Sequence, residues 1–172
     1  MPATGKLPSK ELALKGGAGM HFPSSGPWLS LLLAAISGAL MAVQGSLNAS
    51  LGKIVGLLET TFVVHAVGTA ILAALLFVFQ MGKGDLSAIG SAPWYSYLGG
   101  VVGVFIIYLV AASIPGVGVG NATTAIIVGQ VLTAVAIDCT GLFGLSKIEF
   151  HWQQLAGLAL LAAGAKLLLR GV

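Results

Sequence analysis

Five long apolar stretches alternate with short polar stretches along the chain. The apolar stretches cover residues 28–51, 60–81, 94–114, 119–139 and 152–169. Each is close to the roughly 20 residues that an α-helix needs to cross a hydrocarbon core about 30 Å thick. Lipid offers no hydrogen-bond partner to an exposed backbone, so such segments span membranes as helices. The pattern therefore predicts an all-α integral membrane protein, a bundle of five transmembrane helices.

The polar stretches carry the charges and helix breakers that separate these predicted helices. The gaps contain Lys53 and Glu59, residues 82–85 with Pro93, residues 115–118, and residues 144–149. Residues 1–27 are polar and glycine-rich, without the apolar core of a secretory signal. We expect them to form a flexible N-terminal tail before a transmembrane domain at residues 28–172. Met1 and Met20 are both candidates for the true start.

Composition supports the membrane assignment and narrows the function. Hydrophobic residues make up 57% of the chain and charged residues 8%, against roughly 25% charged residues in soluble domains. The mean hydropathy is +1.01. The net charge of +3 comes mostly from tails and loops and gives no support to nucleic-acid binding. Cys139 is the single cysteine, which excludes an internal disulfide and a cysteine-cluster metal site, and we expect no cofactor.

Tryptophans and lysines bear on how the chain sits in the membrane. Five crossings would place the tryptophans that open the first, third and fifth helices at one interface, where indole rings prefer to lie: Trp28, Trp94 and Trp152. The N-terminal side carries five basic residues against three, which favours a cytoplasmic N-terminus. A start at Met20 removes three lysines from the richer side. The bias then disappears, and such a chain would insert in both orientations.

Polar residues inside the first predicted helix lie beside a face of small residues. Steps of four and three residues align Gly38, Ala42, Gly45, Ala49 and Gly52. Gln44 and Asn48 lie one turn apart on an adjacent face. Small residues let helix backbones approach closely in lipid, and carboxamides hydrogen-bond between helices. Helix packing accounts for the small face, whereas Gln44 and Asn48 are candidates either for packing or for lining a polar cavity.

Three further side chains are candidates for a transport path. In the fourth predicted helix Gln130 lies eight residues before Asp138, roughly 12 Å along the axis. Asp138 has two interpretations. As a structural residue near the membrane surface, it pairs with Lys147 or caps the following turn. As a functional residue, it faces a water-filled cavity and exchanges a proton or a cationic substrate. His65 lies in the second predicted helix. Its candidate roles are a hydrogen bond to another helix and a proton relay.

The glycine-rich stretch at residues 116–120 lacks the preceding strand and the Gly-Lys-Ser or Gly-Lys-Thr ending of a phosphate-binding loop. We interpret it as a hinge after Pro115. Asn121, Thr123 and Thr124 are then expected to satisfy the free backbone donors of the next helix.

Taken in order, several short motifs resemble a known family. They are Gln44-Gly45-Ser46-Leu47-Asn48, Trp94 followed by the glycines of 98–103, Pro115 with its glycines, Gly129-Gln130, and Ile137-Asp138 followed by residues 141–144. These motifs are similar to the five-helix YdcZ branch of the drug/metabolite transporter superfamily. The resemblance covers almost all of residues 28–169. A histidine commonly follows the acid in this family, whereas Cys139 stands here.

This resemblance implies a half-size, EamA-like transporter in the cell's inner membrane that must pair with a second copy or a paralogue, with the two halves thought to lie antiparallel. It implies a secondary transporter of a small metabolite or drug-like solute rather than an enzyme. The candidate residues of the substrate path are Gln44, Asn48, Gln130, Asp138 and His65. The alternative is a membrane scaffold or accessory subunit whose polar residues only fix helix packing.

Overall fold

A computed structural model describes residues 26–169, and this part of the chain is helical, without strands. The long helices are α1 (Pro27–Val55), α2 (Leu57–Ala73), α3 (Leu98–Val117), α4 (Val119–Thr140) and α5 (Trp152–Leu168). A π-helical turn (Ala74–Val78) continues α2, and short 3-10 turns cover Leu86–Ser91, Trp94–Tyr97 and Leu142–Gly144. Of the tail predicted at residues 1–27, residues 1–25 lie outside the described residues, and Pro27 already begins α1.

The connections between α1 and α2 and between α3 and α4 are much shorter than predicted. Gly56, with φ of 101°, is the only residue between Val55 and Leu57, so the predicted gap at residues 52–59 is wrong. A glycine at positive φ reverses the chain in one residue. Lys53 and Glu59 therefore belong to the last turn of α1 and the first turn of α2, where their charges complement the helix dipoles. Gly118, with φ of 83°, plays the same part between α3 and α4.

The expected hinge and cap around Pro115 also differ from the structure. Pro115 lies inside α3, which continues to Val117. Asn121 Nδ2 donates to the Val117 carbonyl at 2.9 Å and Thr124 Oγ1 to the Gly120 carbonyl at 2.8 Å. These side chains thus bond acceptors rather than the backbone donors that we expected. The reason is that helical side chains lean toward the N-terminus and reach the carbonyl four residues earlier.

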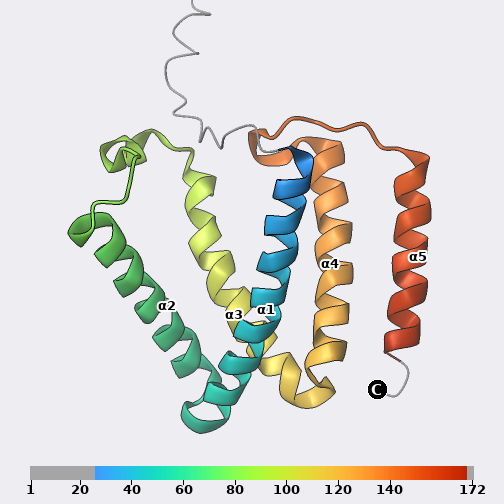
Figure 1. Cartoon of the computed structure of the whole chain (residues 1–172), viewed down its shortest axis with the longest axis horizontal. Helices are drawn as coiled ribbons and strands as arrows, with labels where there is room; N and C mark the ends of the chain where they lie inside the picture. The colour runs from blue at the N-terminus through green and yellow to red at the C-terminus, as the bar shows by residue number, and fades with distance from the viewer. Residues whose placement is uncertain (1–25, 170–172) are drawn as a thin grey trace, which may run out of the picture.

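The helices form an open layer in which α1 and α3 cross at the centre (Figure 1). α1 packs against α2 and α3, α4 packs against α3 and α1, and α5 packs against α4. α1, α3 and α5 run from the same end of the bundle, and Trp28, Trp94 and Trp152 are exposed there. α1 and α2 lie close together at the opposite end, where Gly56 joins them, and spread apart toward the tryptophan end (Figure 1).

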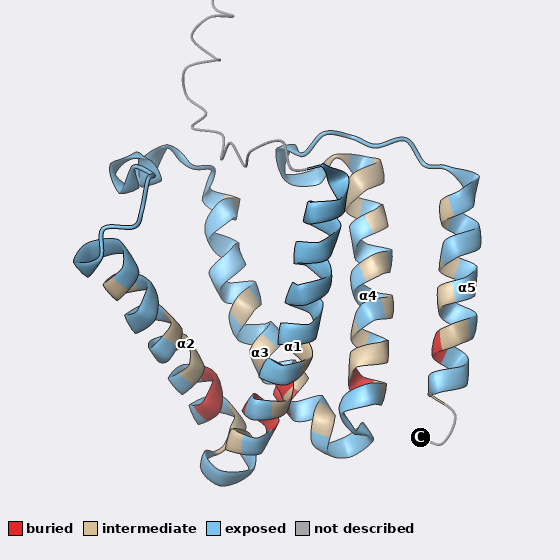
Figure 2. Ribbon diagram, in the orientation of Figure 1, coloured by how far each residue is buried: buried red, intermediate tan, exposed pale blue. Residues whose placement is uncertain are grey.

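Small residues make up what is buried in this bundle. The buried residues among those described are Gly45, Asn48, Ala49, Thr60, Thr61, Ala111, Ala122 and Ala165. Many of them gather where α1, α2 and α3 converge (Figure 2). Large apolar side chains point outward along every long helix, as they do where lipid is the solvent. Backbone proximity, rather than a core of large side chains, holds the helices together.

Four helical segments are long and apolar enough to cross a membrane: Pro27–Val55, Leu57–Val78, Trp94–Val117 and Val119–Thr140. They support a multi-pass helical membrane protein. The second segment ends at Val78, where the π-helical turn gives way to Gln80 at φ of 50°, rather than at residue 81. α5 has 17 residues, which extend over roughly 25 Å.

Candidate functional site

The small face of α1 has two parts with different surroundings. A Cβ at Gly45 would lie 2.8 Å from Val110 Cγ1 and 3.2 Å from Ile114 Cδ1. Gly52 is similarly close to α2, where a Cβ would lie 3.0 Å from Leu57 Cδ2. Nothing lies within 4 Å of a Cβ at Gly38. The face therefore packs tightly at Gly45 and Gly52 and opens toward Gly38.

A small cavity lies in this open part, between α1, α3 and α4. Its volume is about 120 Å³, and it is lined by Gly38, Met41, Ala42, Gly45, Val110, Ile114, Thr123, Ile126, Ile127 and Gln130. Thr123 and Gln130, both from α4, are its polar side chains. Ligand pockets usually enclose roughly 300–1,000 Å³. The cavity of one chain is thus large enough for a few waters and too small for a drug-like solute.

Gln44 and Asn48 do not line this cavity. Asn48 is buried, with 6% of its surface exposed, near the convergence of α1, α2 and α3. Gln44, one turn away, is exposed on the flank of α1. Next to this region the buried hydroxyls of Thr60 and Thr61 donate to the Gly56 and Leu57 carbonyls, each at 2.8 Å. The threonines therefore satisfy their hydrogen bonds within α2.

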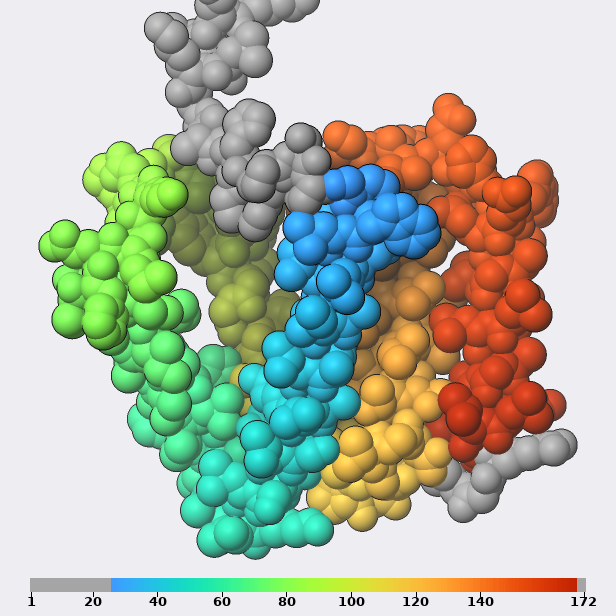
Figure 3. All heavy atoms as spheres, viewed as in Figure 1, coloured from blue at the N-terminus to red at the C-terminus, as the bar shows by residue number. Residues whose placement is uncertain are grey.

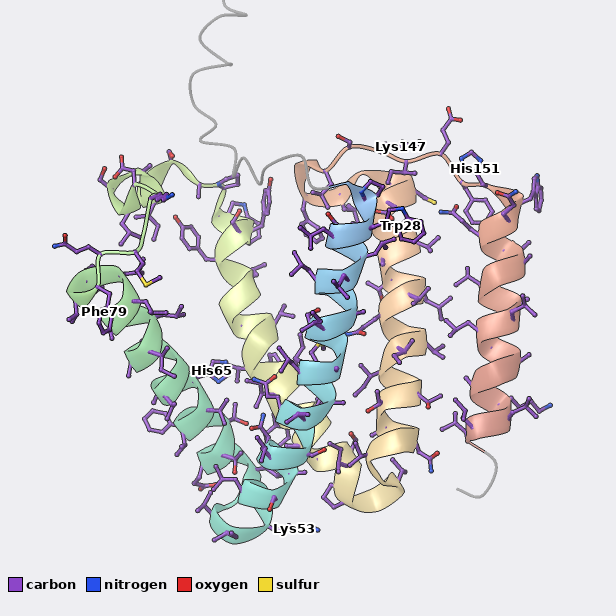
Figure 4. All side chains as sticks on the ribbon, in the orientation of Figure 1. Trp28, Lys53, His65, Phe79, Lys147 and His151 are labelled. Carbon is purple, nitrogen blue, oxygen red and sulfur yellow. The ribbon has the colours of Figure 1, made fainter. Side chains whose placement is uncertain are left out.

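His65 lines a second hollow, an open groove between α2 and α3 that we call the α2–α3 groove. Its volume is about 700 Å³, and it is lined by Leu58, Glu59, Thr61, Phe62, Val63, His65 and Val104. The ring of His65 projects from α2 toward the centre of the bundle (Figure 4). Its Nδ1 lies 2.8 Å from the Thr61 carbonyl, and its Nε2 lies 3.7 Å from a Cβ placed on Gly103. Figure 3 shows that the molecule is hollowed between α2 and α3.

Glu59 is the residue of this groove that sequence reasoning missed, because we placed it in a solvated loop. Its position three residues after Gly56 was the available signal, since a glycine at positive φ can connect two helices without a loop. Glu59 then falls on the first turn of α2, and its side chain reaches the groove.

Asp138 lies in the last turn of α4, at the tryptophan end of the bundle, and is half-buried. Its backbone carbonyl accepts a hydrogen bond from the Ile148 N–H at 2.9 Å. Gly141, at φ of 67°, ends the helix, and a Cβ there would lie 3.4 Å from Lys147 Cβ. The chain after α4 thus folds back over the last turn and brings residue 147 near the helix end.

The five candidate residues therefore occupy different places within one chain. Gln130 lines the small cavity, His65 lines the α2–α3 groove, Asn48 is buried at the helix convergence, Gln44 is exposed on α1, and Asp138 lies at the end of α4. Within residues 26–169, no cluster of three or more histidine, cysteine or acidic residues could hold a metal ion.

Comparison with known proteins identifies the family. A family model described as "Putative inner membrane exporter, YdcZ" matches residues 29–167. Neither a curated protein nor a solved structure matches the chain. The family description points to transport rather than catalysis, and it confirms the resemblance found in the motifs. The match covers most of the chain, which therefore belongs to the YdcZ family of membrane exporters.

Proposed function

We propose that this protein is a secondary transporter that exports a small metabolite or drug-like solute across the inner membrane, working as a dimer by alternating access. The observation that carries the proposal is the family match together with the incomplete cavity around Gln130. A cavity of about 120 Å³ cannot enclose such a solute. A second chain against this surface would enlarge and close it.

The distribution of polar side chains supports pairing. Gln44 is exposed on a helix whose other outward residues are mainly large and apolar, including Leu40, Val43 and Leu47. A carboxamide facing lipid lacks hydrogen-bond partners, whereas one facing a second chain can find them or line a path. The partner is a second copy or a paralogue, and the weak lysine bias favours an antiparallel arrangement. α5 serves in this proposal as a fifth membrane crossing beside α4.

The uneven packing of the bundle suggests how access alternates. α1 and α2 meet at Gly56 and spread apart toward the tryptophan end. In an antiparallel pair, the tight end of one chain lies beside the open end of the other. Rocking of the two halves against each other would then open the path to one side of the membrane at a time.

The test compares the culture medium of cells that make the wild-type protein with that of cells that make a variant with a filled cavity. Gly38→Leu places a side chain in the cavity, while Gly157→Leu places one in open space on α5 and is its matched control. We expect untargeted mass spectrometry to find at least one small solute enriched outside wild-type and Gly157→Leu cells but not outside Gly38→Leu cells. A medium indistinguishable from that of cells without the protein would favour the scaffold or accessory-subunit alternative.

A further inference from the structure

The α2–α3 groove is large enough to hold a ligand and is separate from the cavity around Gln130. Its volume of about 700 Å³ lies within the usual range for sites that bind small molecules. Most of its lining is apolar, from Leu58, Phe62 and Val63 on α2 and Val104 on α3. These side chains would bury the hydrophobic body of a solute that enters sideways from the lipid.

The groove has a negative charge at one end. Glu59 lies in the first turn of α2, and its carboxylate lies against Gly56, where the absence of a Cβ leaves room for it. The side chain is exposed, close to the end of the helix and so to the membrane surface. It is the charged residue among those that line the groove. A carboxylate in this position complements a cationic group.

The groove also has a hydrogen-bond acceptor further along α2. His65 lies six residues after Glu59, roughly 9 Å along the helix axis. Its Nδ1 can bond the Thr61 carbonyl only as a donor, because a carbonyl oxygen only accepts. Nε2 of the neutral ring is then an acceptor, and it faces the space that Gly103 leaves open on α3. The groove thus offers the Nε2 atom of His65 as a hydrogen-bond acceptor, further along α2 than the carboxylate of Glu59.

We propose that the α2–α3 groove binds arylalkylamines that carry a hydrogen-bond donor at the end opposite the ammonium group. The ammonium group pairs with Glu59, the aromatic body lies against Phe62 and Val104, and the distal donor bonds His65 Nε2. This inference rests on the proposed function, because it names the chemical class of the exported solute. Binding is nevertheless measurable without transport.

The experiment uses the full chain in phosphatidylcholine nanodiscs and three related probes. Tyramine has the ammonium group and a distal phenol, phenethylamine lacks the phenol, and tyrosol replaces the ammonium group by an uncharged hydroxyl. We expect isothermal titration to show tyramine binding at least ten-fold more tightly than either of the other two. Saturating tyramine should also shift the imidazole nitrogen resonances of His65.

Matched variants assign this binding to the groove. Glu59→Gln should weaken tyramine binding at least ten-fold, whereas Glu149→Gln, which removes an exposed carboxylate elsewhere, should not. His65→Ala should weaken the binding of tyramine but not that of phenethylamine. Val104→Trp fills the groove from α3 and should abolish binding of both amines, while Leu160→Trp, on the exposed side of α5, should preserve it.

Several outcomes would overturn the proposal. They are the absence of tyramine binding to the wild-type protein, equal binding of tyramine and tyrosol, and tyramine binding that survives both Glu59→Gln and Val104→Trp in variants that remain folded and monodisperse. Equal binding of the neutral probe would identify the groove as a site for lipid chains. The proposed export function fails on a different result, an unchanged culture medium, so the two failures are distinguishable.

Discussion

Gly45 offers the sharpest test of how the bundle is held together. A Cβ at this position would lie 2.8 Å from Val110 Cγ1, whereas carbon atoms in contact normally lie about 3.5–4.0 Å apart. The nearest pair must therefore separate by roughly 0.7 Å or more. Val110 cannot easily turn away, because a valine on a helix has one strongly preferred rotamer. Even an alanine at residue 45 should thus push α1 and α3 apart.

Gly38 provides the matched control on the same helix. Nothing lies within 4 Å of a Cβ there, so Gly38→Ala gains only the better helix propensity of alanine, about 1 kcal/mol. Gly45→Ala gains the same amount but also pays the cost of overpacking, typically about 1–3 kcal/mol. Since the propensity gain cancels between the two variants, their difference in unfolding free energy isolates the steric cost. We expect Gly45→Ala to be less stable than Gly38→Ala by about 1–3 kcal/mol.

The measurement is equilibrium unfolding in mixed micelles with increasing sodium dodecyl sulfate, followed by tryptophan fluorescence and far-ultraviolet circular dichroism. Gly45→Leu, with a larger side chain, should lower the midpoint further. The reasoning is refuted if Gly45→Ala unfolds at the same point as Gly38→Ala or later, because close approach of α1 to α3 would then contribute nothing to stability.

Three further predictions concern charge and orientation. Asp138→Asn should abolish export or its pH dependence, measured on the solute found in the medium; unchanged export at all pH values would make the acid structural. Hydrogen bonds from the Ser87 hydroxyl and backbone N–H lower the pKa of Asp85, so this carboxylate contributes stability above its ordinary pKa that is lost as the pH falls through the lowered value. Ser87→Ala should raise that pKa in a carbon-13 NMR titration, and an unmoved titration curve would contradict the assignment. Single cysteines at residues 24 and 172 in a Cys139→Ser background should each be labelled from both sides of the membrane; labelling of each from one side only would exclude an antiparallel homodimer.

The apolar pattern was sufficient to place the long helices, because burying backbone in lipid leaves few alternatives. It failed at their ends. Lys53 and Glu59 looked like loop residues, yet Gly56 alone reverses the chain between them. The side chains of Asn121 and Thr124 were assigned to the wrong backbone partners, because the bias of helical side chains toward the N-terminus outweighed the capping tendency of these residues.

The sequence indicated single candidate residues but not how residues of different helices come together. The small face of α1 and the candidate Gln130 could be read from the chain, whereas their meeting at one cavity is a relation between α1 and α4 that the structure supplies. The α2–α3 groove depends on Val104 and Gly103 lying opposite His65. That is a relation between helices distant in sequence, which no local pattern contains.

The single-residue connection at Gly56 also matters for how the chain is made. α1 and α2, joined by one residue, form a tight helical hairpin that we expect to insert as a unit, and so do α3 and α4, which are joined at Gly118. Both connections lie at the same end of the bundle (Figure 1), and each consists of a single glycine, so neither contains a basic loop residue. The loops that can carry further basic residues therefore lie at the other end, near Lys83 and Lys147, whereas Lys53 at this end stands on α1 itself. Because the positive residues are few, we expect substitution of one or two of them there to shift the balance between the two orientations of the chain.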